Sequence, residues 1–94
     1  MSQTRSVIAR ISGHVQGVGY RDWTRRKGAG LGLSGWVRNL ANGDVEALFS
    51  GPSGAVDNML AACRRGPQLA RVDAVTVAET DEAASGPFSV RRDR

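Results

Sequence analysis

Hydrophobic and polar residues alternate near the start of the chain. Between residues 6 and 15 the apolar side chains Val7, Ala9, Ile11 and Val15 occupy odd positions, and polar side chains occupy most of the even ones. A two-residue period puts the apolar side chains on one face of an extended segment. We therefore predict a strand with one buried face.

The pattern then changes to a loop and a helix. Residues 13–20 contain three glycines and no helical period, whereas the mainly polar residues 21–31 predict a helix with a thin apolar stripe of Trp23, Thr24 and Leu31. Gly28 and Gly30 fall within this helix, and each costs about 1 kcal/mol relative to alanine in a helix interior. We expect these two glycines to lower the stability of the helix.

A hairpin is predicted for the middle of the chain. Residues 34–40 and 45–50 flank the sequence Ala41, Asn42, Gly43, Asp44. Asn-Gly is the residue pair that a tight primed turn favours, because both of its central residues have positive φ angles. The two segments are thus predicted to be antiparallel strands.

A second helix and two further strands complete the pattern. Ser53 is a candidate N-cap for a helix that ends at Gly66 and Pro67, and its apolar residues Val56, Met59, Leu60 and Cys63 have the spacing of one buried face. Residues 72–79 are rich in Val and Thr and predict a strand, and Phe88 and Val90 mark a short last one.

This order of elements, βαββαβ, predicts an α+β fold. Each element has one apolar side to bury, so the economical arrangement is a ferredoxin-like sandwich with a mainly antiparallel sheet and two helices on one face. The 94 residues allow one core, and we expect a single domain over residues 1–94.

The charge of the chain favours anionic partners. Thirteen Lys and Arg against nine Asp and Glu give a formal charge of +4 and a pI near 10.6. This field attracts small phosphate compounds and nucleic acids alike. Cys63 is the sole cysteine and is predicted to be a buried thiol, which suits a reducing compartment. The absence of an apolar run near 20 residues leads us to expect a cytoplasmic protein without a membrane segment.

The glycine-rich segment before the first helix is the candidate binding site. Glycines allow backbone NH groups to converge, and the helix N-terminus behind them carries a partial positive charge that favours phosphate. Arg21 adds a planar fork of donors that matches two phosphate oxygens. The spacing fits neither the Walker pattern nor GxGxxG, so nucleotide binding is disfavoured. From these local features alone, a turn without function remains an alternative.

Three longer motifs carry a family resemblance. The runs GHVQGVGYR at 13–21, LGLSGWVRN at 31–39 and NGDVEA at 42–47 resemble the acylphosphatase family. The resemblance implies a ferredoxin-like fold and metal-independent hydrolysis of the carboxyl-phosphate anhydride of acyl phosphates to a carboxylate and inorganic phosphate. It also implies that Arg21 clamps the phosphate, that Asn39 positions the attacking water, and that phosphate binds the backbone NH groups of Val15, Gln16, Gly17, Val18, Gly19 and Tyr20.

The resemblance also sets the expected partners. We expect a small acyl phosphate as substrate, inorganic phosphate or sulfate as a competing anion, no cofactor, no metal, no nucleic acid, no membrane and a monomer. A metal site would need a cluster of His, Cys or carboxylate ligands that the sequence does not suggest. His14 is predicted to be incidental, since it falls on the polar face of the first strand, and Asp44 and Glu46 are interpreted as a solvated face.

Two alternatives share the same fold. One is an RNA-binding ferredoxin-like domain, which would need aromatic residues spaced along a central strand for bases to stack on. Residues 45–50 offer only Phe49. The other is an acylphosphatase-like domain that binds without catalysis. Trp23, Trp36, Phe49 and Phe88 are predicted to be packing residues, and the arginine pairs at 25–26, 64–65 and 91–92 to be solvated surface.

Overall fold

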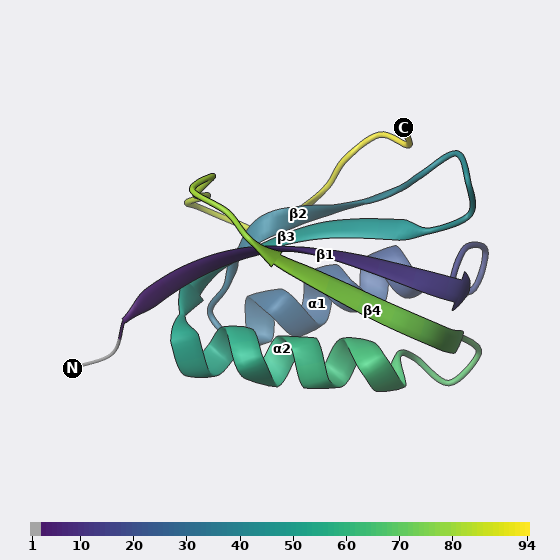
Figure 1. Ribbon diagram of the computed structural model, residues 1–94, viewed down its shortest axis with the longest axis horizontal. Coiled ribbons are helices and arrows are strands. Elements are labelled where there is room, and N and C mark those ends of the chain that lie inside the picture. The colour runs from purple at the N-terminus through teal and green to yellow at the C-terminus, as the bar shows by residue number, and fades with distance from the viewer. Residues whose placement is uncertain (1–2) are drawn as a thin grey trace.

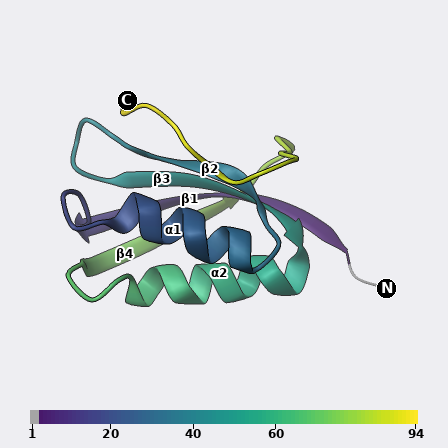
Figure 2. The same cartoon turned by 180° about the vertical axis from the view of Figure 1, so that it is seen from behind.

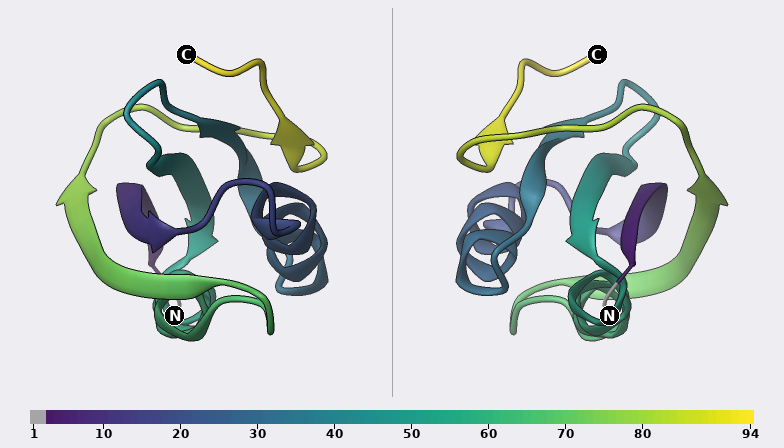
Figure 3. Two further views of the ribbon diagram at one scale, coloured as in Figure 1. Left: turned by 90° about the vertical axis from the view of Figure 1, so that its right-hand side faces the viewer. Right: turned by 90° about the vertical axis from the view of Figure 1, so that its left-hand side faces the viewer.

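One curved sheet of five strands carries two helices on a single face, as the computed structural model of residues 3–94 shows (Figures 1 and 3). The strands lie in the order β4-β1-β3-β2-β5. Three of the strand pairs are antiparallel, and β2 and β5 are parallel. The elements are β1 (Thr4–His14), α1 (Tyr20–Gly30), β2 (Ser34–Asn39), β3 (Val45–Pro52), α2 (Ser53–Arg65), β4 (Arg71–Glu79) and β5 (Ser89–Val90).

This architecture confirms the predicted α+β, ferredoxin-like arrangement. The two-residue strand β5 is the short last strand that Phe88 and Val90 indicated, and it extends the sheet beyond β2. Neither α1 nor α2, within residues 3–94, is long and apolar enough to cross a membrane.

The core lies between the sheet and the helices. The odd positions of β1 point into it, since Val7, Ala9 and Ile11 are fully buried. The predicted face of α2 covers them, and its four apolar residues Val56, Met59, Leu60 and Cys63 belong to the same cluster. Both periodicities that the sequence displayed, two residues for β1 and about 3.6 for α2, are therefore confirmed.

Strand β1 is hydrogen-bonded on both sides, which fixes the point from which the next loop leaves the sheet. Ile11 pairs with Val45 of β3 on one side and with Val75 of β4 on the other. The pairing with β4 has a bulge opposite Ser12 and Gly13, and its extra residue, Asp73, belongs to β4. The chain leaves the sheet after His14 and enters α1 at Tyr20.

Two local predictions were wrong in detail. The β2–β3 connection is not the primed turn that Asn42-Gly43 suggested, because Gly43 has a positive φ of 99° but Asn42 does not. The Gly43 NH donates to the Leu40 carbonyl, and the Asn42 side-chain oxygen accepts from the Asp44 NH at 3.0 Å. A local side-chain hydrogen bond of this kind stabilises a wider loop around a single left-handed glycine.

The start of α2 also differs from its prediction. Ser53 is the first helical residue and makes no capping hydrogen bond with its side chain, and Pro52 precedes it as the N-cap. The Ser53 NH instead donates to the carbonyl of Gln3, so a neighbouring strand end satisfies this helix donor. Gly66 ends the helix as predicted, with a φ of 67°.

The face of the sheet opposite the helices is partly covered by the connection between β4 and β5, which arches over it in Figure 3. Trp36 points to this face and is 4% exposed, with the guanidinium groups of Arg38 and Arg91 each 4.7 Å from its ring centre. Glu46 is not simply solvated, because it accepts hydrogen bonds from Arg38 at 2.6 and 2.9 Å.

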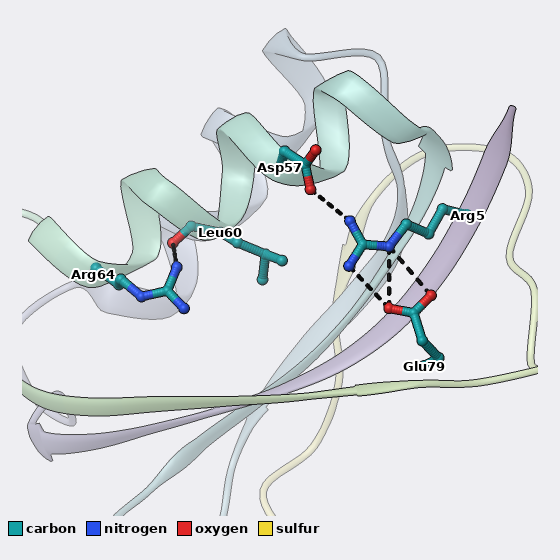
Figure 4. A network of polar contacts seen from close by, with 5 residues as sticks. All are labelled: Arg5, Asp57, Leu60, Arg64 and Glu79. Atoms are coloured by element: carbon teal, nitrogen blue, oxygen red, sulfur yellow. Dashed lines mark hydrogen bonds and ion pairs between the residues drawn. The ribbon is translucent and has the colours of Figure 1, made fainter. Parts of the chain in front are cut away.

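A cluster of charged side chains around Arg5 lies at the N-terminal end of β1, which is the end far from α1's first turn. Arg5 donates to Asp57 of α2 and to Glu79 of β4 (Figure 4), and its hydrogen bonds to Glu79 lower the pKa of that carboxyl. A hollow of about 440 Å³ lies beside this cluster. Its charges are paired with one another, so the cluster joins α2 to the sheet edge.

Gly28 allows α1 to approach the sheet closely. A Cβ atom at this position would lie 3.1 Å from the Phe88 ring, whereas one at Gly30 would meet nothing within 4 Å. Phe88 has little room to yield, since it stacks on Phe49 and a Cβ at Gly35 would lie 3.0 Å from it. The two helix glycines therefore have different roles, and only Gly30 simply weakens the helix.

We expect Gly30→Ala to raise the free energy of unfolding by about 0.5–1 kcal/mol, because alanine restricts the unfolded chain and suits a helix. Gly28→Ala is expected to lower it by about 1–3 kcal/mol through overpacking against Phe88. Urea unfolding followed by circular dichroism measures both. Equal stabilisation by the two substitutions would contradict the close packing of α1 against Phe88.

Candidate active site

A cavity of about 300 Å³ opens where β1 ends and α1 begins. Figure 2 shows the loop between these elements at the same end of the molecule as the β2–β3 hairpin. The cavity is formed by the loop, the first turn of α1, the end of β2 and strand β5. Its lining residues are Val15, Gly17, Gly19, Tyr20, Arg21, Asp22, Asn39 and Val90.

The loop 15–19 has the backbone geometry of an anion site. Gly17 and Gly19 have φ angles of 75° and 81°, a left-handed region that other residues rarely adopt. Helix α1 follows directly, and no side chain caps its first turn. Its first hydrogen bond within the helix runs from the Trp23 NH to the Gly19 carbonyl at 3.0 Å. The earlier NH groups have no acceptor in the helix and favour a negative ligand.

Arg21 brings a positive side chain to this helix start. Its side chain is 39% exposed, and its Nη1 donates to Oδ1 of Asp93 at 2.9 Å. Asp22, the next residue, faces its own helix, where it accepts from Arg25 and Arg26 at 2.9 Å. Hydrogen bonds from these two arginines lower the pKa of the Asp22 carboxyl. The guanidinium of Arg21 is therefore the cationic side chain that lines the cavity.

Asn39 reaches the same cavity from the end of β2. Asn39 lies two residues after the buried Val37 in the same strand, so its side chain points to the same, helix-covered face of the sheet. The residue is 7% exposed, and its Oδ1 is buried without a hydrogen-bond partner among residues 3–94. An unsatisfied buried amide oxygen is costly in a protein interior. Asn39 lines the cavity, so its side-chain amide is suited to hydrogen-bond a bound molecule or water there.

Gln16 and Val18, which the sequence grouped with the loop, lie outside the cavity lining. The Gln16 side chain turns away and donates from Nε2 to the carbonyls of Leu40 and Asp44, both at 2.8 Å. Val18 packs against the core. Gln16 thus links the loop 15–19 to the hairpin that follows Asn39. This side-chain link could not be predicted from the sequence, because its partners are backbone carbonyls 24 and 28 positions away.

Tyr20 holds the start of α1 in place from the other side. Its ring is buried, and its hydroxyl donates to the Cys63 carbonyl of α2 at 2.8 Å. Burial raises the pKa of Tyr20 strongly and that of the Cys63 thiol to about 11. Both groups are therefore neutral at pH 7. The prediction of Cys63 as a buried thiol on the helix face is confirmed.

Metal-ligating residues do not gather in the part of the chain that is described. Within residues 3–94, no three His, Cys, Asp or Glu side chains are grouped so that they would hold an ion. His14 is exposed at the end of β1, where it pairs with Arg71 of β4.

Comparisons with known proteins show which family this chain resembles. Residues 7–90 match the family model for acylphosphatases. The chain is 60% identical over 73 residues to an acylphosphatase of Rhodospirillum rubrum, which covers 78% of this chain and 80% of that protein. It is 52% identical over 79 residues to an acylphosphatase of Alcanivorax borkumensis, covering 84% and 86% of the two chains.

The solved structure of an acylphosphatase from Coxiella burnetii is similar over 94% of this chain and 93% of that one, with a TM-score of 0.90 and 34% identity. Sequence and structure therefore point to the same group of proteins, and the matched region includes the whole cavity lining. The chain belongs to the acylphosphatase family.

Proposed function

We propose that this protein hydrolyses acyl phosphates at the cavity between the loop 15–19 and Asn39. The observation that carries the proposal is that the free NH groups at the start of α1, the guanidinium of Arg21 and the amide of Asn39 line one cavity. Water attack on a phosphoryl group requires a site that binds the anion and a polar group beside it that orients the water. The cavity offers the first at the start of α1 and the second in the amide of Asn39. The products are a carboxylate and inorganic phosphate.

Phosphate binding is assigned to the backbone and to one side chain. The NH groups of residues 15–20 bind the phosphoryl oxygens, and Arg21 offers two parallel donors to the same group. Gln16 contributes its backbone NH to this role, while its side chain keeps the loop fixed to the hairpin. Because the backbone donors are held by the loop and the helix before the ligand arrives, they need little reorganisation as charge develops.

Asn39 is assigned to the attacking water. A neutral amide orients water through hydrogen bonds but takes no proton at pH 7. The water oxygen attacks phosphorus, the bond from phosphorus to the acyl oxygen breaks, and the acyl group leaves as a carboxylate. The proton released by the water passes to an oxygen of the substrate. This division of labour separates Asn39, which acts in the chemical step, from Arg21 and the loop, which bind.

The proposed reaction uses no divalent metal. Asp22 is the single carboxylate in the cavity lining, and it is bound by Arg25 and Arg26. Three or four ligands are usual at a catalytic metal site. The positive charge that stabilises the leaving group then comes from Arg21 and the helix start.

The RNA-binding alternative has little support on the open face of the sheet. Trp36 is the aromatic residue of β2 on that face, and its ring lies beneath Arg38 and Arg91. A base cannot stack on a ring that is already covered. We propose instead a single domain that acts as a monomer, because residues of one chain complete the cavity. We also propose a cytoplasmic location, since the free thiol of Cys63 suits a reducing compartment.

We expect Arg21→Lys to lower kcat/KM for benzoyl phosphate on the order of 10²-fold or more, because an ammonium group cannot reproduce a two-point contact with phosphate. The assay is spectrophotometric and contains a chelator. Arg71→Lys is the matched control, since Arg71 is exposed on β4 and pairs with Asp73. Full activity of Arg21→Lys, or loss of parent activity in the chelator, would refute the proposed mechanism.

Asn39→Ala is expected to separate chemistry from binding. The predicted fall in kcat is on the order of 10²-fold, comparable to the loss of one oriented polar group in a preorganised site. Inorganic phosphate should remain a competitive inhibitor with a similar inhibition constant. Steady-state kinetics compare this variant with Asn58→Ala on the exposed side of α2. If phosphate inhibition disappears together with kcat, Asn39 belongs to the anion site instead.

A further inference from the structure

The last four residues of the sequence follow strand β2 past the end of β5 toward the hairpin (Figure 1). The Arg91 NH donates to the Val37 carbonyl at 2.9 Å, and the Arg94 NH donates to the Asn39 carbonyl at 2.8 Å. The Arg94 carbonyl accepts from the Ala41 NH at 2.6 Å. Residues 91–94, here called the C-terminal segment, are thus bound to the strand end that carries Asn39.

A side-chain contact adds to this attachment. The guanidinium of Arg91 lies 4.7 Å from the centre of the buried Trp36 ring. Such cation–π contacts stabilise the position of an arginine that is otherwise exposed. Backbone and side-chain contacts therefore hold the C-terminal segment in one register along β2, and Asp93 falls between the two bonded residues.

In this register the Asp93 carboxylate contacts Arg21, the arginine that lines the cavity. Oδ1 of Asp93 accepts from Nη1 of Arg21 at 2.9 Å. The side chain of Asp93 is 64% exposed and that of Arg21 is 39% exposed, so water reaches the pair. A carboxylate oxygen offers Arg21 the same kind of charged acceptor as a phosphoryl oxygen.

We propose that Asp93 competes with the phosphoryl group for Arg21 and thereby sets the affinity of the site for anions. The proposal rests on the phosphate-binding function proposed above. When phosphate binds, the Arg21–Asp93 pair is broken or its carboxylate is left close to a second negative charge, and either change opposes binding. A ligand that offers two oxygens to the guanidinium fork displaces the carboxylate more readily than a ligand that offers one.

The size of the effect follows from the exposure of the pair. Exposed ion pairs contribute little, so removal of the Asp93 charge is expected to tighten phosphate binding about two- to fivefold. The gain should shrink as salt is added, because the Debye length falls from about 10 Å at 0.1 M to about 3 Å at 1 M.

The test is the affinity of Asp93→Asn for inorganic phosphate, measured by isothermal titration calorimetry at low and high ionic strength. The matched control is Asp81→Asn, which removes the same charge from an exposed position near the far end of β1. We expect a tighter dissociation constant for Asp93→Asn than for the parent and the control, together with a lower KM and an unchanged kcat for benzoyl phosphate.

Three results would overturn the proposal. Equal or weaker phosphate binding by Asp93→Asn would show that Asp93 does not compete or that it holds Arg21 ready for the ligand. An equal gain in Asp81→Asn would assign the effect to net charge. If neither the parent nor Asp93→Asn binds phosphate, both the competition and the phosphate site are refuted. Tighter binding without any hydrolysis would support the competition and contradict only the proposed catalytic function.

Discussion

The double pairing of β1 is the constraint on which the site depends. Hydrogen bonds to β3 and β4 on its two sides fix the point at which the chain leaves the sheet, and the loop 15–19 leads from there to α1. A loop that begins at a fixed point and ends in an uncapped helix presents its NH groups at one place. The proposed anion site is thus a consequence of strand pairing more than of any one side chain.

The other half of the site comes to this point through the hairpin. Asn39 is the last residue of β2, and the Gln16 side chain joins the loop 15–19 to the carbonyls of Leu40 and Asp44 that follow it. Two hydrogen bonds of 2.8 Å therefore connect the segment assigned to phosphate with the segment assigned to water. In the proposed mechanism the separation of these two groups decides whether attack on phosphorus is in line, so this connection is expected to support catalysis without contact with the substrate.

Periodicity and turn residues were enough to predict the strands, the helices and their order, because those signals arise between near neighbours in sequence. The local motif indicated Arg21, and the family resemblance indicated both Arg21 and Asn39. Contacts between distant residues were not predictable in this way. The fit of Gly28 against Phe88 depends on how closely α1 approaches the sheet, and the pair of Arg21 with Asp93 joins positions 72 apart.

Nuclear magnetic resonance of the ¹⁵N-labelled protein during a titration with inorganic phosphate tests the central claim most directly. If the backbone NH groups bind the anion, the amide signals of residues 15–21 should shift together and saturate with one dissociation constant. The amides of α2 and of the Arg5 cluster at the far end of β1 should change little. Shifts that are largest at that far end, or that fail to saturate, would contradict a preformed phosphate site at the start of α1.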